Sequence, residues 1–316
     1  MSKAFASKGD LDPKNISFTQ LADNAYAYTA EGDPNTGVVI GDDCVMVLDA
    51  QATPIMARDV IAKIRTVTDK PIKHVVLTHY HAVRVLGASG YGAANIIASK
   101  DTYDLIVERG QQDYQSEFER FPRLFQAVDS IPGLTWPNVV FSGELTIWLG
   151  KTEVRLMQVG RGHTKGDTIA WMPKEQVLFS GDLVEYGATP YTGDAYLTEW
   201  PATLDRIAAL KPRALVPGRG DALTDPKQVA DALHGTRAFI TQMFDSVRAA
   251  RAAGRSLKQA YDDTYAALKA NFGHWVIFDH CLPFDISRAY DEAGGAVDPR
   301  IWTAERDAEM WTSMAT

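Results

Sequence analysis

Two histidines, His79 and His81, stand two positions apart directly after the apolar run at residues 74–77. On a strand, residues i and i+2 point to the same side, so imidazoles at this spacing at a strand end can converge on one point. Neutral imidazole is the commonest metal ligand in proteins. The spacing therefore indicates a metal site, although hydrogen-bonded core histidines explain the pair alone about equally well.

Three further segments place a polar residue in a turn after an apolar run. His163 lies in the glycine-flanked loop GHTKGDT (162–168), Asp182 ends FSGD (179–182), and Arg219 lies in PGRG (217–220). Loops of this kind can aim a side chain at a site. Taken singly, each is also compatible with a plain turn or a helix cap, and Asp167 of the first loop is expected either to orient a metal ligand or to hold the turn.

In this order, the segments THxH, GHTxGD, SGD and PGxG resemble the motifs of the metallo-β-lactamase-fold superfamily, over residues from about 20 to 225. The resemblance implies an α/β fold, a four-layer αβ/βα sandwich with a metal site at one edge of the two sheets. It also implies that His79, His81 and His163 bind one metal and that Asp182 joins the site, normally by bridging to a second metal. Such motifs are specific for fold and much less so for substrate.

The second metal site of the family is altered in this chain. The family pattern HxHxDH is HYHAVR at residues 79–84, so Val83 and Arg84 replace an aspartate and a histidine, and Arg219 replaces the histidine of a PGHG turn. Valine has no donor atom and arginine stays protonated, which leaves only Asp182 from that site. Together, two guanidinium groups carry about the same positive charge as one divalent ion.

We therefore expect Arg84 and Arg219 to replace the second metal, binding an anionic group of the substrate or stabilising negative charge that develops on it. A structural ion cluster of Arg84, Asp182 and Arg219 is the alternative. The expected ligands of one Zn²⁺ per chain are His79, His81, His163 and Asp182, since three imidazoles with a carboxylate or water suit zinc. Two imidazoles with Asp182 also suit Fe²⁺.

The chemistry expected is that of a mononuclear zinc-dependent hydrolase of a small anionic ester, thioester, lactone or amide, with catalytic residues Asp182, Arg84 and Arg219. Two other classes are open: a mononuclear non-haem iron oxygenase acting on a sulfur compound, and a non-catalytic protein that binds an anion. Hydrolysis of β-lactams fits the resemblance, but nothing in the sequence selects it.

The elements that must position these residues alternate between strand and helix. Apolar runs at 38–40 and 45–48 flank a Gly-Asp-Asp turn and predict a hairpin, and residues 55–67 have helical spacing behind Thr53 and Pro54. Further strands are predicted at 74–77, 95–98, 144–148, 153–157, 168–171, 176–179 and 214–216. Helices at 226–252, 256–270 and 299–313 predict a helical C-terminal extension, 226–316, packed on a core of residues 1–225.

Two segments have uses that the sequence leaves open. The helix expected from about residue 101 is predicted to be amphipathic with a solvated charged face, or else to form part of a pocket wall. Residues 271–285 combine histidine, cysteine and aspartate with aromatic residues. They are expected to form a packed irregular segment between helices, or alternatively a lid in which His280 or Cys281 supplies a substrate contact or an extra ligand.

Composition limits the partners. The 316 residues include 32 Lys and Arg against 40 Asp and Glu, a net charge of −8, which argues against nucleic acid or an anionic membrane as the main partner. The sequence has no apolar run of about 18 residues and no apolar leader at its start, and its two cysteines are too few for a disulfide framework. We expect a soluble, cytoplasmic protein whose partner is a small anionic substrate.

Overall fold

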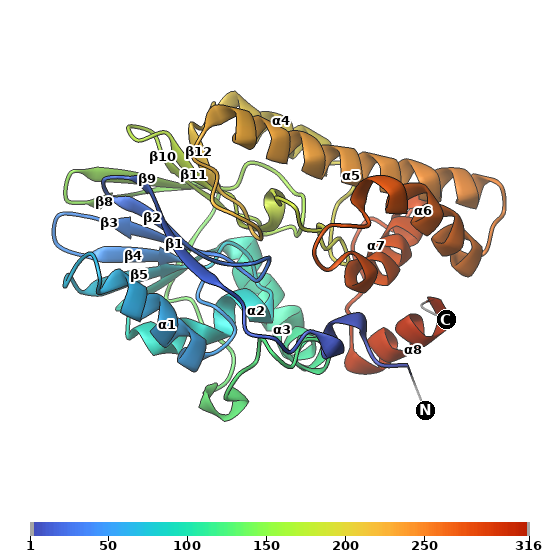
Figure 1. Ribbon diagram of the computed structural model, residues 1–316, viewed down its shortest axis with the longest axis horizontal. Helices are drawn as coiled ribbons and strands as arrows, with labels where there is room; N and C mark the ends of the chain where they lie inside the picture. The colour runs from blue at the N-terminus through green and yellow to red at the C-terminus, as the bar shows by residue number, and fades with distance from the viewer. Residues whose placement is uncertain (1–2, 315–316) are drawn as a thin grey trace.

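The computed structural model describes residues 3–314, whose strands form two sheets (Figure 1). The first has seven strands in chain order: β1 (Ile16–Ala22), β2 (Ala25–Ala30), β3 (Thr36–Ile40), β4 (Val45–Leu48), β5 (Ile72–Val76), β6 (Asn95–Ser99) and β7 (Val139–Phe141). The second has the order β12 (Ala214–Val216), β11 (Val177–Phe179), β10 (Ile169–Met172), β9 (Thr152–Met157) and β8 (Glu144–Leu149). Pairing is parallel from β4 to β7 and between β11 and β12, and antiparallel elsewhere.

The two sheets pack face to face, and helices cover both outer faces. Strand β4 shows the alternation that makes this possible, because Val45 and Val47 join the cluster under the helices while Met46 and Leu48 join the cluster between the sheets. Gly37 lies at the closest approach of the sheets, where an added Cβ would meet the Phe179 ring at 2.3 Å. The predicted four-layer sandwich is confirmed.

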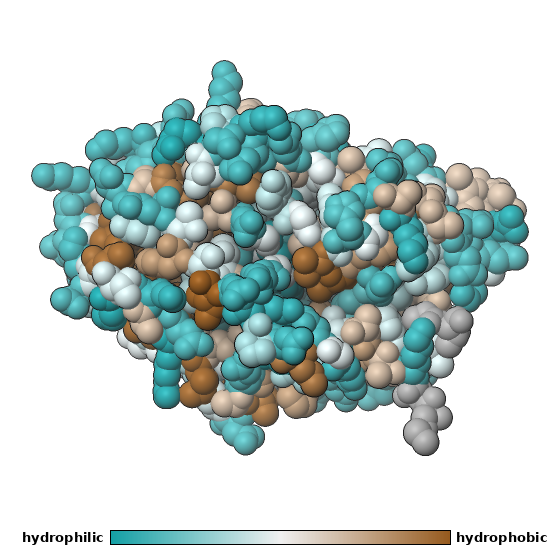
Figure 2. Space-filling view, in the orientation of Figure 1, coloured by the Kyte–Doolittle hydropathy of each residue, from teal (hydrophilic) through white to brown (hydrophobic). Residues whose placement is uncertain are grey.

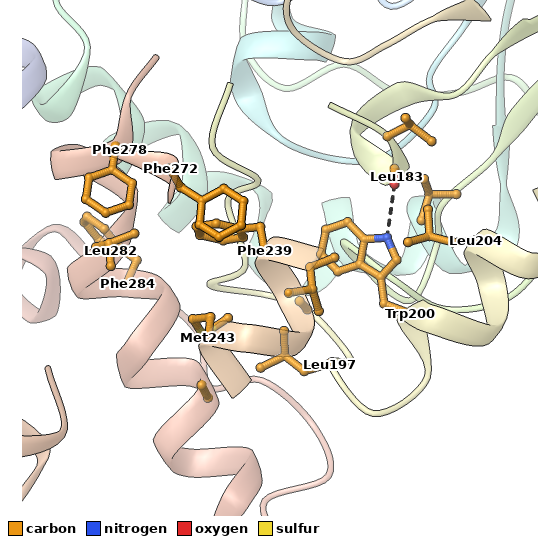
Figure 3. Packing of buried hydrophobic residues seen from close by; sticks show 14 of the residues in the cluster. Leu183, Leu197, Trp200, Leu204, Phe239, Met243, Phe272, Phe278, Leu282 and Phe284 are labelled. Atoms are coloured by element: carbon orange, nitrogen blue, oxygen red, sulfur yellow. Dashed lines mark hydrogen bonds between the residues drawn. The ribbon is translucent and has the colours of Figure 1, made fainter. Parts of the chain in front are cut away.

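Helices α1 (Pro54–Ile64), α2 (Ala82–Val85) and α3 (Lys100–Arg120) cover the first sheet. Helix α4 (Trp200–Ala209) covers the second, together with a helical C-terminal region of α5 (Pro226–Ala252), α6 (Leu257–Phe272), α7 (Phe278–Ala293) and α8 (Ala304–Met314). Figure 3 shows Trp200 donating to the Leu183 carbonyl at 3.1 Å beside apolar side chains of α5, α6 and α7. The C-terminal helices therefore share one hydrophobic cluster with the second sheet.

Local sequence signals explain where several helices begin. The Thr53 hydroxyl accepts from the Met56 N–H at the start of α1, where Pro54 takes the first position. Ser256 and Gln259 form a reciprocal capping box at the start of α6. Short 3₁₀ turns complete the chain at Ala6–Gly9, Leu86–Tyr91, Val128–Ser130 and Gly181–Leu183.

Two sequence-based expectations are wrong. Residues 278–293 are not an irregular segment but helix α7, which accommodates Pro283 in its interior and begins after Ile277 at a left-handed φ of 58°. The charged face of α3 is not solvated throughout, because Arg109, Asp113, Glu117 and Arg120 are buried. Both errors arise where distant parts of the chain, rather than neighbouring residues, supply the surroundings.

The first described residues lie beside the last helix, α8 (Figure 1). The Trp311 indole N–H donates to the Ala4 carbonyl at 2.9 Å, and the Phe5 ring lies 5.4 Å from that of Trp311. Hydrophilic residues predominate on the face in Figure 2, with hydrophobic ones scattered in small groups. Within residues 3–314, no helix combines the length and apolar character needed to cross a membrane.

Candidate metal centre

Three imidazoles meet at the edge of the sandwich. His79 and His81 lie in the loop after β5, which ends at Val76, and His163 lies in the loop between β9 and β10. The ring centroids are 4.6 to 4.9 Å apart, and one nitrogen of each ring lies within 4.8 Å of the others. The convergence expected of the first two holds, but the turn into α2 produces it and not the pleat of a strand.

The outer nitrogen of His79 is held through a threonine. The Thr78 hydroxyl lies 3.0 Å from His79 Nδ1 and donates to Asp49 Oδ2 at 2.8 Å, while the Thr78 N–H donates to Asp49 Oδ1 at 2.9 Å. Because the hydroxyl proton is committed to Asp49, the hydroxyl oxygen accepts from His79 Nδ1–H. Nε2 of His79 therefore carries the lone pair.

The outer nitrogens of the other two rings face acceptors. His81 Nε2 lies 3.2 Å from Asp194 Oδ2, and His163 Nδ1 lies 2.8 Å from the Tyr191 carbonyl. Each outer nitrogen is thus the donor, which leaves His81 Nδ1 and His163 Nε2 as the inner nitrogens, 2.9 Å apart. Metal-binding histidines are typically fixed in this way through the nitrogen that does not bind the ion.

The inner nitrogens of the three rings are placed where they could bind one divalent ion. His79 Nε2 is buried without a hydrogen-bond partner among the described residues. The inner nitrogens of His81 and His163 would face each other with two lone pairs, an arrangement that needs a cation or an added proton between them. Three neutral imidazoles are a donor set that suits Zn²⁺. The residues present therefore fit a metal ion.

Charges around the imidazoles set their protonation. Burial lowers the pKa of His163 to about 3 and that of His79 well below its usual value. Burial opposes a charge on His81 too, but the Asp113 and Asp194 carboxylates outweigh it and raise its pKa to about 9. Burial would raise the pKa of Asp194, yet the contact with His81 lowers it to about 2. A carboxylate therefore stays ionised behind one of the three rings.

The acids of helix α3 are buried because they bind the backbone at the start of α2. Asp113 Oδ2 accepts from the Ala82 N–H at 2.7 Å, and Glu117 Oε2 accepts from the Val83 N–H at 3.0 Å. These N–H groups begin α2 and have no partner within that helix. Arg109 is also buried, and its Nη1 donates to Asp194 Oδ1 at 3.2 Å. The face that was expected to be solvated thus holds the loop that carries His79 and His81.

The other half of the site is a guanidinium–carboxylate pair. Arg84 Nη2 binds Asp182 Oδ1 and donates to the Gly218 carbonyl at 2.8 Å, while Nη1 donates to the Asn35 carbonyl at 3.1 Å. Asp182 Oδ2 lies 3.7 Å from both His79 Nε2 and His163 Nε2. Burial would raise the pKa of Asp182, but Arg84 and its other charged neighbours lower it. Asp182 therefore faces the imidazoles as a carboxylate.

Arg219 is held less tightly than Arg84. Its backbone N–H donates to the Glu185 carboxyl group, whose pKa burial raises well above its usual value. Its guanidinium makes one hydrogen bond within the described residues, from Nη1 to the Gly32 carbonyl at 3.1 Å. Gly218 lies close to Asp182, since an added Cβ would meet Oδ1 at 2.3 Å. The PGRG turn thus brings Arg219 to the site with guanidinium donors to spare.

Other residues singled out from the sequence lie elsewhere. Asp167 accepts from the Thr164 N–H and hydroxyl, so it holds its own loop, and burial raises its pKa to about 7. His280 and Cys281 are buried on α7, and neither belongs to the three-histidine group. Sequence reasoning missed Asp49, Asp194 and the Tyr191 carbonyl, which fix the imidazoles from positions without a motif.

Comparison with known proteins agrees with this geometry. The family model of the metallo-beta-lactamase superfamily matches residues 29–219. A metallo-beta-lactamase type 2 of Bacteroides fragilis is 27% identical over 223 residues, covering 66% of this chain and 80% of the relative. A metallo-beta-lactamase type 2 of Bacillus cereus is 24% identical over 220 residues, covering 65% and 77%.

Solved structures extend the similarity of fold beyond that region. A metallo-beta-lactamase from Pontibacter korlensis superposes with a TM-score of 0.57 at 19% identity, over 72% of this chain and 99% of that one. A double mutant of the sec-alkyl sulfatase PisA1 superposes with a TM-score of 0.69 at 14% identity, over 88% of this chain and 50% of that one. The second match reaches into the C-terminal helices.

Proposed function

Because the chain belongs to the metallo-beta-lactamase superfamily and keeps three convergent imidazoles, we propose that it is a single-metal hydrolase of a small anionic ester, thioester, lactone or amide. The observation that carries this proposal is the state of the imidazoles, whose outer nitrogens are held while the inner ones converge. His79, His81 and His163 would hold one ion, with zinc the ion that best suits them.

A divalent ion there supplies a Lewis acid that lowers the pKa of a bound water. The chain contributes orientation. Arg84 binds one oxygen of Asp182, which leaves Oδ2, 3.7 Å from two of the imidazoles, to accept a hydrogen bond from the attacking water. Because Arg84 lowers the pKa of Asp182, this carboxylate suits the orientation of a water better than the removal of its proton.

The two arginines are proposed to have different roles. Arg84 donates to two backbone carbonyls and to Asp182, so its charge substitutes for a second ion without facing a substrate. Arg219 makes one side-chain hydrogen bond and can offer its remaining donors to an anionic group or to a developing oxyanion. In this proposal, Arg84 takes the structural role considered from the sequence and Arg219 the role of the anion clamp.

Two substrate types merit a first test within this class. One structural neighbour is a sec-alkyl sulfatase whose match covers most of this chain, and a sulfate ester is an anionic ester. The relatives in Bacteroides fragilis and Bacillus cereus are metallo-beta-lactamases, so a β-lactam belongs in the same panel. A thioester and a lactone complete it.

The decisive experiment combines metal analysis with this panel. Protein purified without chelator is expected to carry about one zinc per chain, and its hydrolysis of one panel member should stop on chelation and return with zinc. The Arg219→Gln variant should raise KM for an anionic substrate roughly 10-fold or more, as expected for a lost charged hydrogen bond. Two ions per chain, oxygen consumption by an iron-loaded protein, or no turnover with any metal would overturn the proposal.

A further inference from the structure

A second group of buried polar atoms lies beyond Tyr191, where α3 and α7 meet the loop 189–192. Among the described residues, these side-chain atoms have no hydrogen-bond partner: Arg120 Nη1, both ring nitrogens of His280, the hydroxyls of Thr189 and Thr192, Asp285 Oδ2 and Asp307 Oδ1. Buried groups of this kind are normally bonded to protein or to ordered water. Because these atoms lie in one region of the fold, a bound polar ligand could supply the hydrogen-bond partners that they lack.

Arg120 is fixed in place with donors to spare. Its guanidinium carbon lies 4.5 Å from the centre of the Phe284 ring and 5.4 Å from that of Tyr191. The Asp307 and Glu117 carboxylates are 3.6 and 3.8 Å away, within ion-pair range but too far for good hydrogen bonds. A guanidinium whose faces are stacked on rings keeps its N–H edge for planar oxyanions.

His280 lies against the same aromatic residues. Its ring is 4.2 Å from Phe121 and 5.7 Å from Phe284, a residue of α7 labelled in Figure 3. Burial, followed by the positive charges of Arg120 and Arg219, holds the pKa of His280 well below its usual value. The neutral ring offers one donor and one acceptor. His280 therefore lies close to the charge of Arg120, which the Asp307 and Glu117 carboxylates balance in part.

Tyr191 links this region to the imidazoles. Its ring lies 5.6 Å from His81 and 6.2 Å from His163 on one side, and 5.8 Å from Phe284 on the other. One ring thus separates the imidazoles from the Arg120 side chain. A small molecule that reacts at the imidazoles could reach Arg120 with a second group.

We propose that Arg120 and His280 form a distal subsite that binds a carboxylate, sulfonate or sulfate group at the end of the substrate remote from the bond that is cleaved. The idea rests on the proposed function and narrows its substrate class to small molecules with two acidic or acceptor groups. Arg219 takes the group beside the reacting bond, and Arg120 takes the distant one. The Thr189 and Thr192 hydroxyls complete the polar lining.

The test measures anion binding by chelator-treated protein, so it does not depend on hydrolysis. Sodium sulfate and sodium succinate are titrated at constant ionic strength, followed by NMR of ¹⁵N-histidine-labelled protein, with His280→Gln assigning the His280 signals. The ring signals of His280 should shift on titration, and Arg120→Gln should weaken binding about 10-fold or more. Arg248→Gln is the matched control, since Arg248 also stacks on a phenylalanine but is 64% exposed.

Arg120→Lys and Thr192→Val provide readouts if Arg120→Gln fails to fold. Lysine keeps the charge but loses the planar fork, so its binding should be intermediate. His280 signals that no probe moves, or equal binding by wild type and the Arg120 and His280 variants, would overturn the subsite. Binding that depends on Arg219 alone would leave the proposed function standing without the subsite. Binding that depends on Arg120 in a protein with no hydrolytic activity would support the subsite and reject the hydrolase.

Discussion

The centre has two halves, the three imidazoles and the Arg84–Asp182 pair, and their polar atoms are satisfied in different ways. In the imidazole half, the outer nitrogens are held and the inner nitrogens of His81 and His163 face each other 2.9 Å apart. In the arginine half, the donors of Arg84 and the Asp182 carboxylate largely satisfy one another and nearby carbonyls. The imidazole half needs a cation or an added proton between its inner nitrogens, whereas the arginine half already contains a cation.

The arginine half differs from the family pattern in its residue types. Replacing ligands by Val83 and Arg84 removes donor atoms, but it also supplies a fixed positive charge to the remaining acid, Asp182. A buried carboxylate without such a partner would be costly. We therefore expect the two halves to respond separately to mutation.

The largest separation is expected from His163→Ala. It removes one of three inner nitrogens, so metal content should fall from about one ion per chain to nearly none, as measured by mass spectrometry after desalting. The control is His74→Ala, a histidine on β5 outside the three-histidine group. A full complement of metal in the His163 variant would contradict the assignment of His163 as a metal ligand.

The next largest effect is expected from Arg84→Met, on stability. It leaves Asp182 buried without its partner, which should lower the free energy of unfolding by about 3–5 kcal/mol in urea denaturation. Adding Asp182→Asn should restore part of the loss. A variant that stays stable and metal-loaded but binds substrate poorly would instead make Arg84 the clamp.

Asp194→Asn tests whether the acceptor behind His81 contributes to metal affinity. The variant weakens the acceptor behind His81 without removing a ligand, so metal affinity should fall roughly 10- to 100-fold in chelator competition while saturating metal still binds. Asp298→Asn is the matched control. Asp298 and Asp194 line one pocket of about 130 Å³, but Asp298 accepts from the Tyr196 hydroxyl and not from a histidine. Equal affinities in the two variants would remove Asp194 from the site.

The smallest effect is expected far from both halves. Ser256→Ala removes the hydroxyl that caps α6, which should cost about 1 kcal/mol of unfolding free energy. Metal affinity should not change, because α6 supplies no residue to the centre. A parallel fall in metal affinity would show that the C-terminal helices and the imidazoles are one energetic unit.

Sequence patterns were most informative where neighbouring residues carry the signal. His79, His81 and His163 lie in short motifs, and Thr53-Pro54 marks the start of α1 by itself. Asp49 and Asp194 could not be found this way, because each acts on a histidine from a distant segment without a motif. Their roles depend on tertiary packing and not on spacing.

The same reason explains the two wrong expectations. The polar face of α3 looks solvated in isolation, but its acids meet the N–H groups of residues 82 and 83, which no helical period reveals. Pro283 argues locally against a helix, yet α7 forms because its apolar residues enter the shared cluster with α5 and α6. Tertiary burial outweighs local propensity in both segments.

Burial of the imidazoles also bears on how fast a bound metal ion would leave the site. His79, His81 and His163 are each at most 2% exposed. If an ion held there leaves when the segments around it open, its departure rate equals an opening rate of the protein. Once a chelator captures every released ion, a higher chelator concentration would no longer speed the loss. The ion acquired during folding would then be the ion the chain keeps.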